Sequence, residues 1–140
     1  MVKLHNTMLK KNILKKMVGD IVYLNSEQIR EFRYDQIFPE DFNSQQLEGG
    51  IISMKDDRGI KKVMFDVVSS RDFHGGYIKG FFYSDGRFLG HFYYTADANL
   101  PKETIDGNYT KIRDGYEIKG IFYKGGTLQT AFCARLMKEI

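Results

Sequence analysis

Apolar and polar residues alternate with a period of two along most of the chain after Asp20. A period of two is typical of β-strands, because successive side chains point to opposite faces. The alternating runs are separated by short turn-forming segments, of which Asp85-Gly86 and Gly125-Gly126 are the clearest. Such pairs favour two-residue hairpin turns that need positive φ at both centres. The pattern predicts about eight or nine antiparallel strands joined mostly as hairpins.

Residues 1–17 follow a different pattern. Apolar residues recur at every fourth position from Leu9 to Met17, and lysines fill most of the positions between them. This spacing predicts an amphipathic helix. We therefore expect residues 1–18 to form an N-terminal helix and residues 19–140 to form a single antiparallel β-barrel domain.

The segment between the predicted helix and the hairpins is less regular. Residues 28–35 alternate and are predicted to form a strand. Residues 36–50 contain Pro39 and many polar residues, which predicts a connector with at most one helical turn.

Two of the hairpins carry nearly the same sequence. YIKGFFYSDGRFLGHFYY occupies residues 77–94 and EIKGIFYKGGTLQTAFCA occupies residues 117–134, each with a glycine inside an apolar run, Gly80 and Gly120. Glycine inside a strand usually marks a bulge or a bend in a curved sheet. The repeat therefore predicts a sheet that curls on itself at two equivalent places.

The glycines also predict a cross-strand pairing. Two-residue turns would place Gly80 opposite His91 and Gly120 opposite Ala131. A large ring lying over a strand glycine retains contact area at a bend. We expect the His91 ring to fill the gap above Gly80.

Neither face of these hairpins is polar throughout. A sheet with one solvated face should alternate cleanly, so both faces are expected to be at least partly covered. The predicted fold is mainly β: a strongly curved antiparallel meander, closed or nearly closed into a barrel, with an N-terminal helix. In outline this architecture resembles the lipocalin and avidin-like barrels, and no motif carries a site over from them. One face of the two hairpins holds Phe82, His91, Tyr93 and Phe122, and the other holds Tyr83, Tyr94 and Tyr123.

Composition and charge narrow the classes of function. The net charge of +3 is spread along the chain, so we expect no specific nucleic-acid binding. The single cysteine, Cys133, rules out an internal disulfide and is predicted to be an inert buried thiol. No run approaches the length of a transmembrane helix and no signal peptide is evident, which predicts a cytoplasmic protein; a signal peptide already removed would leave the same sequence.

No catalytic motif is present. The chain has no nucleophile elbow, P-loop, dinucleotide fingerprint or paired metal-binding histidines, so no cofactor is expected. Asp66 is unusual because it interrupts an apolar run, and a buried carboxylate needs a partner. His91 is either a packed ring or a polar group in a cavity. The candidate ligand-binding residues are Asp66, Phe82, His91, Tyr93 and Phe122.

These observations support three hypotheses. The first is a non-catalytic barrel that binds a small apolar or aromatic molecule. The second is a protein-binding module, such as a small inhibitor or immunity-type partner, and a homo-oligomer is compatible with it. The third is an enzyme that uses either His74 with Asp72 and Arg71, or Asp66 with His91. A hollow barrel interior would favour the first hypothesis, and a filled interior with an exposed aromatic patch would favour the second.

Overall fold

The computed structural model describes residues 13–24, 44–55, 59–68, 75–95 and 99–139. The described residues form strands and turns without a helix. The strands are β1 (Lys15–Leu24), β2 (Ser44–Lys55), β3 (Ile60–Val68), β4 (Gly76–Phe82), β5 (Arg87–Tyr93), β6 (Glu103–Ile112), β7 (Gly115–Lys124) and β8 (Thr127–Lys138).

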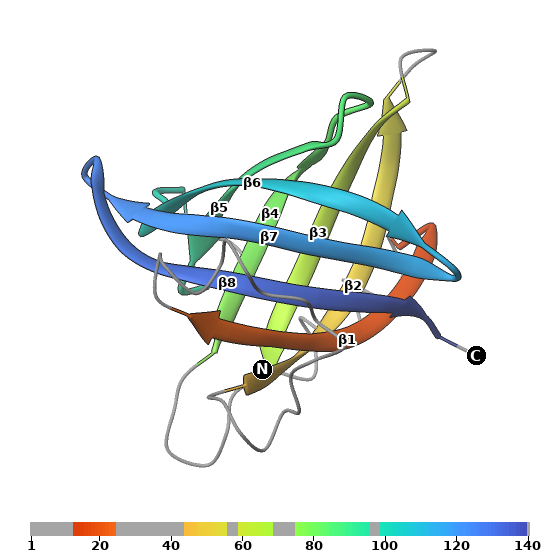
Figure 1. Ribbon diagram of the computed structural model, residues 1–140, viewed down its shortest axis with the longest axis horizontal. Coiled ribbons are helices and arrows are strands. Elements are labelled where there is room, and N and C mark those ends of the chain that lie inside the picture. The colour runs from red at the N-terminus through yellow and green to blue at the C-terminus, as the bar shows by residue number, and fades with distance from the viewer. Residues whose placement is uncertain (1–12, 25–43, 56–58, 69–74, 96–98, 140) are drawn as a thin grey trace.

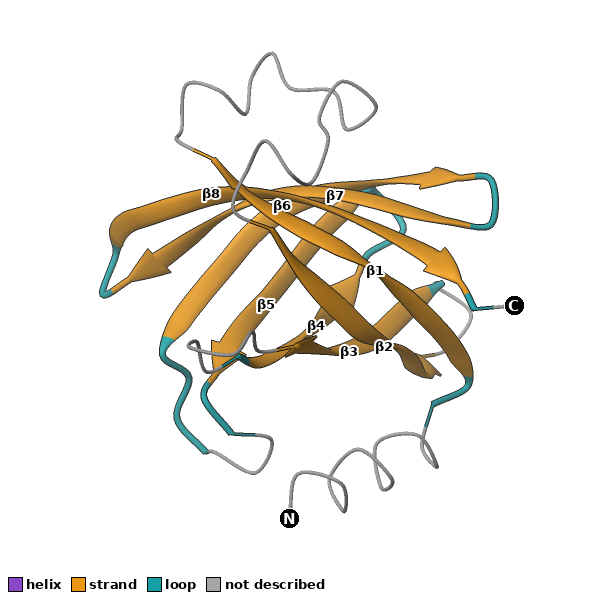
Figure 2. Cartoon of the chain, turned by 90° about the horizontal axis from the view of Figure 1, so that it is seen from below, coloured by secondary structure: helices purple, strands orange, loops and turns teal. Residues whose placement is uncertain are grey.

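Each strand pairs antiparallel with its neighbours in sequence, and β1 also pairs with β8, so the sheet closes into a barrel. The predicted fold class is thereby confirmed, with eight strands. In Figure 1, β6, β7, β8 and β1 cross in front of β2 to β5, and Figure 2 shows the same two layers from below. The barrel is therefore flattened, and the two layers enclose its core. The described part of the chain contains no helix long and apolar enough to span a membrane.

Alternation along each strand places one set of side chains inside the barrel. In β4, for example, Ile78 and Phe82 are buried inside, whereas Tyr77, Lys79 and Phe81 are half-buried on the outer face. The interior set is almost entirely aliphatic and aromatic, which supplies the main hydrophobic stabilisation of the fold. Its largest fully buried members are Phe65, Phe82, Phe88, Phe132, Met17, Ile21, Leu47, Ile105, Leu136, Val63 and Val67.

The β4–β5 turn differs from the predicted two-residue turn. The Gly86 amide donates to the Tyr83 carbonyl and the Tyr83 amide donates to the Arg87 carbonyl, which leaves three residues in the loop. Gly86 has a φ of 92°, as the third position of such a loop requires. The extra residue shifts the register by one. Gly80 consequently pairs with Gly90 rather than with His91, so that prediction is wrong.

The second repeated hairpin keeps its two-residue turn at Gly125 and Gly126, both with positive φ as predicted. A bulge between Phe122 and Tyr123 then shifts the register. Gly120 pairs with Phe132 instead of the predicted Ala131. A Cβ on Gly120 would lie 2.7 Å from Cε1 of Phe132, so a ring does cover this glycine.

The N-terminal part of the barrel begins earlier than predicted. Lys15 to Met17, expected at the end of the helix, are already paired with β2. Strand β2 starts at Ser44, inside the segment 36–50 that was expected to be a connector. Ile13 and Leu14 are not helical either, and the Leu14 amide donates to the Ile51 carbonyl. Residues 1–12 of the predicted helix and the predicted strand at 28–35 lie outside the described residues.

The two ends of the barrel differ. One end is closed by stacked rings, since the Phe82 centroid lies 4.5 Å from that of Tyr109 and 4.9 Å from that of Tyr116. The Tyr109 hydroxyl donates to the Tyr83 carbonyl at 2.5 Å, and Lys61 Nζ donates to the Tyr116 hydroxyl at 3.0 Å. We call this the plugged end. At the opposite, open end lie the strand ends that flank the three long connections, β1–β2, β3–β4 and β5–β6.

Candidate functional site

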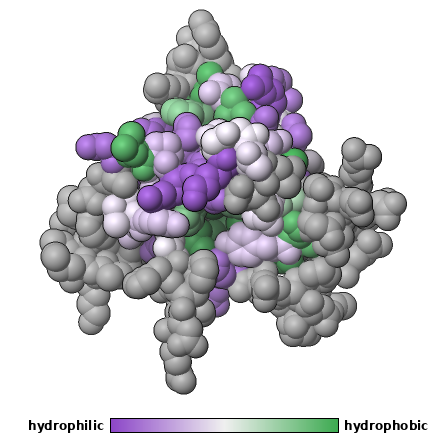
Figure 3. Space-filling view, turned by 90° about the vertical axis from the view of Figure 1, so that its left-hand side faces the viewer, coloured by the Kyte–Doolittle hydropathy of each residue, from purple (hydrophilic) through white to green (hydrophobic). Residues whose placement is uncertain are grey.

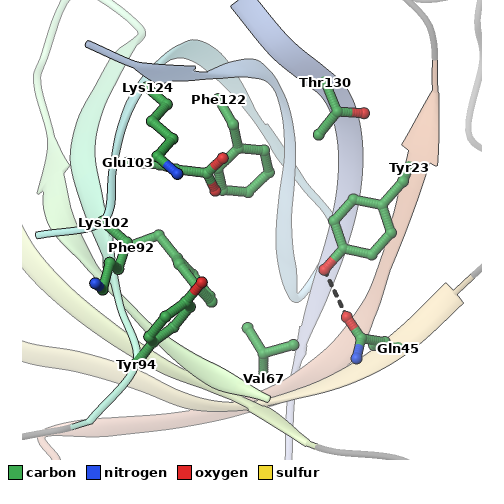
Figure 4. Close-up of a pocket in the computed structure, with 10 residues that line it drawn as sticks. All are labelled: Tyr23, Gln45, Val67, Phe92, Tyr94, Lys102, Glu103, Phe122, Lys124 and Thr130. Carbon is green, nitrogen blue, oxygen red and sulfur yellow. Dashed lines mark hydrogen bonds between the residues drawn. The ribbon is translucent and has the colours of Figure 1, made fainter. Parts of the chain in front are cut away.

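The open end contains a cavity of ≈ 350 Å³ (Figure 4). Side chains from β1, β2, β3, β5, β6, β7 and β8 line it, together with two residues of the β5–β6 connection. Figure 3 views the molecule from the side of the β7–β8 turn and shows polar side chains around a recess with apolar ones within. The lining consists of Tyr23, Gln45, Val67, Phe92, Tyr94, Lys102, Glu103, Phe122, Lys124 and Thr130.

The apolar part of the cavity is mainly aromatic. The Phe122 ring centroid lies 6.3 Å from the centroids of both Tyr23 and Phe92, and the Phe92 ring is nearly perpendicular to it at 88°. Phe92 in turn meets Tyr94 edge to face at 5.9 Å. These rings are held by β1, β5 and β7 from both layers of the barrel, and their faces and edges are suited to contact a flat apolar molecule.

On one wall, β1 and β2 bring Tyr23 and Gln45 together. The Tyr23 hydroxyl donates a hydrogen bond of 2.6 Å to Oε1 of Gln45. Burial, with a smaller contribution from the Glu103 carboxylate, raises the pKa of Tyr23 to about 12. The phenol is therefore neutral at physiological pH.

Glu103 occupies the opposite wall at the start of β6, beside Lys124 of β7 (Figure 4). Burial raises the pKa of the Glu103 carboxyl, and the ammonium of Lys124 partly offsets the effect. Among the described residues the Glu103 side chain has no hydrogen-bond or ion-pair partner. Lys102 lies at the rim, where its Nζ is 4.9 Å from the ring centroid of Tyr94.

The five residues predicted to bind a ligand do not form one group. Phe82 and Phe122 lie inside the barrel, but Phe82 belongs to the plugged end and only Phe122 lines the cavity. Asp66, His91 and Tyr93 are on the outer face, because the register places Asp66 beside Tyr77, which pairs with Tyr93.

The two predicted catalytic sets fare differently. His74, Asp72 and Arg71 lie outside the described residues. Asp66 and His91 are separated by β4 and point away from the interior, so they do not meet in a barrel mouth. Burial and the neighbouring Glu48 raise the pKa of Asp66. The described residues hold no group of three or more His, Cys, Asp or Glu that could bind a metal ion.

Part of the outer face is also apolar, as predicted. Val22 and Leu24 of β1 are buried there with Ala131 and Cys133 of β8. The pKa of the Cys133 thiol is raised to about 12, mainly by burial. The expectation of a buried thiol is confirmed, although the thiol is on the outer face and not among the interior side chains.

A second concavity, of ≈ 530 Å³, lies on the outer face over β4 to β6. Half-buried Phe81, Leu89 and Tyr93 form its apolar part, and His91 is exposed in it. Lys79 Nζ lies 4.7 Å from the ring centroid of Tyr93. The candidate residues His91 and Tyr93 therefore belong to a different surface from Phe122.

Sequence reasoning did not single out Tyr23, Gln45, Glu103 or Lys124. All four lie at strand ends, next to long connections or to the glycine turn of β7–β8. One signal was available: short and long connections alternate along the chain, which places the long ones at the same end of a meander. Polar residues at the strand ends beside the long loops were therefore the candidates for a binding site at that end of the barrel.

The fold and the site together define a closed eight-stranded antiparallel barrel with one plugged end and one open, aromatic-lined end. No protein family model matches the chain, and neither the curated proteins nor the solved structures contain a significant match to it.

Proposed function

We propose that this protein is a non-catalytic binding protein that takes a small aromatic or apolar molecule into the open end of its barrel. The observation that carries the proposal is the cavity of ≈ 350 Å³ at the open end, whose lining includes four aromatic rings and which lies beside a packed interior. Pockets for small molecules are typically concave, largely apolar and equipped with a few polar groups. The cavity is more polar than this average: beside its aromatic rings and Val67 it holds the polar groups of Tyr23, Gln45, Lys102, Glu103, Lys124 and Thr130, so we expect its ligand to carry a polar group as well as an apolar part.

The proposal is tested by filling the cavity. Val67 is buried and points into it, whereas the next residue, Val68, is half-buried on the outer face of the same strand. Amide chemical shifts would be followed by NMR while a panel of small apolar and aromatic fragments is added. Shifts are expected around Phe122 and Thr130 in the wild type and in Val68→Phe, and their loss is expected in folded Val67→Phe.

Equal binding by Val67→Phe and wild type would overturn the proposal, as would shifts confined to the outer face. Thermal unfolding of both variants supplies the folding control, because inserting a larger side chain into a packed site typically costs about 1–3 kcal/mol.

A second candidate is a protein-binding role for the outer concavity over β4 to β6. The specific observation is its apolar centre of Phe81 and Leu89 beside Lys62 and Lys79, which suits a partner segment with apolar and acidic residues. In a cellular assay of function, Leu89→Glu would abolish activity under this alternative while Val67→Phe would not. The opposite result supports the cavity.

A further inference from the structure

Three polar groups of the cavity are hydrogen-bond acceptors, and its donors are the Gln45 amide and the ammonium groups of Lys102 and Lys124. The Tyr23 hydroxyl uses its proton in the bond to Gln45, so its oxygen is left as an acceptor toward the cavity. Thr130 is in a similar state, because its hydroxyl donates to the backbone carbonyl of Leu24 at 3.2 Å. Glu103, with no hydrogen bond among the described residues, adds a carboxylate acceptor.

The charges of the site oppose a charged ligand. Lys102 and Lys124 outnumber Glu103, so an organic cation would be repelled by the two ammonium groups at the rim. An organic anion that enters past the lysines would meet the acceptor oxygens of Tyr23, Thr130 and Glu103. A neutral molecule avoids both the repulsion by the lysines and the unfavourable contact of an anion with the acceptor oxygens. A hydrogen-bond donor on such a molecule would bind the Glu103 carboxylate.

We infer that the ligand is a neutral, planar aromatic molecule whose N–H or O–H group donates a hydrogen bond to the Glu103 carboxylate. Its ring lies against the aromatic wall formed by Phe122 with Tyr23 and Phe92, whose centroids are each 6.3 Å from that of Phe122. This inference rests on the proposed function and specifies the ligand class.

Indole and 1-methylindole provide a matched pair of probes, since they differ in the N–H donor. The chain has no tryptophan, so indole fluorescence reports the probe without a tryptophan background. Titrations would use the wild type, Glu103→Met, and Glu48→Met as a control on the exposed outer face of β2. A hydrogen bond to a charged group is worth about tenfold or more in affinity.

We expect the wild type and Glu48→Met to bind indole about tenfold more tightly than 1-methylindole, and Glu103→Met to lose most of this preference. Equal affinities in the wild type would overturn the donor inference and leave the cavity as a binding site. Tighter binding of tryptamine or of indole-3-acetate than of indole would assign a cationic or an anionic ligand and also overturn it.

If these probes do not bind, the NMR titration with Val67→Phe separates the two proposals. Binding of other apolar fragments in the cavity would overturn only the donor inference. No binding of any fragment would overturn the proposed function itself.

Discussion

Gly80 of β4 and Gly90 of β5 face each other directly across the ladder, without a side chain between the two strands. A Cβ added to Gly80 would lie 2.6 Å from the Leu89 carbonyl oxygen and 2.9 Å from Cε1 of Phe88. The strands are therefore closer here than side chains allow, and the adjacent Phe88 ring fills the interior space. Glycines at such close approaches are typical of bends in a curved sheet.

The first prediction concerns Gly80. Gly80→Val should lower the free energy of unfolding by about 1–3 kcal/mol, because the new side chain must displace backbone as well as the Phe88 ring. Urea unfolding would measure the change. Thr104→Val, at an exposed position of β6, is the control and should change the midpoint little. Coinciding midpoints for Gly80→Val and wild type would refute the close approach.

The second prediction concerns the plugged end. Tyr109→Phe removes the hydrogen bond from the Tyr109 hydroxyl to the Tyr83 carbonyl and leaves that acceptor without its donor. We expect a loss of about 0.5–1.5 kcal/mol in the free energy of unfolding. Tyr94→Phe is a suitable control because the Tyr94 side chain is 62 % exposed. If both variants unfold at the same denaturant concentration as the wild type, the hydrogen bond does not contribute to stability.

The third prediction concerns pH and Asp66. Its pKa is raised in the folded protein above the ordinary value of 3.8, chiefly by burial and further by Glu48. The unfolded chain therefore loses the proton first, and stability falls as pH rises through 3.8 toward the folded-state pKa. Across the sheet, Asp66 is paired with Glu48 of β2 and with Tyr77 of β4.

Asp66→Asn removes this penalty. The variant should be more stable than wild type at neutral pH, and the difference should disappear below the ordinary carboxyl pKa of 3.8. Urea midpoints at neutral pH and below pH 3.8 would measure this difference in stability. Asp106→Asn, at an exposed position of β6, is the control. A stabilisation of Asp66→Asn that is independent of pH would show that the carboxylate charge is not the cause.

The fourth prediction concerns Cys133. Burial, the main cause, raises the pKa of its thiol to about 12, so the reactive thiolate is scarce at neutral pH. Alkylation by iodoacetamide should be much slower than that of a free thiol in solution, and should reach the solution rate after denaturation in urea. Rapid modification of the native protein, followed by mass spectrometry, would contradict the buried position.

The fifth prediction separates the two surfaces that contain candidate residues. His91→Ala and Tyr93→Ala alter the outer face and should leave the affinity of an aromatic fragment for the cavity unchanged. Val67→Phe should abolish that binding. Weakened binding in the outer-face variants, measured by the same NMR titration, would place the ligand in the outer concavity.

The sequence alone determined the fold class. Alternation with period two predicted the strands after residue 50, and Gly125-Gly126 predicted a turn that the structure contains. The error at the N-terminus has a simple cause, because a spacing of four residues suits a strand as well as a helix. Met17 and Ile21, four residues apart, lie on the same interior face of β1.

Only the tertiary structure decided which face of each hairpin is the interior. One extra residue in the β4–β5 turn and one bulge in β7–β8 turn the side chains of β5, and those of β8 beyond the bulge, to the face opposite the predicted one. The sequence does not distinguish a two-residue from a three-residue loop at Asp85-Gly86. The cavity depends on closure as well, since Tyr23 and Lys124 are far apart in sequence. They line the same cavity only because β1 pairs with β8, a long-range contact that local patterning does not encode.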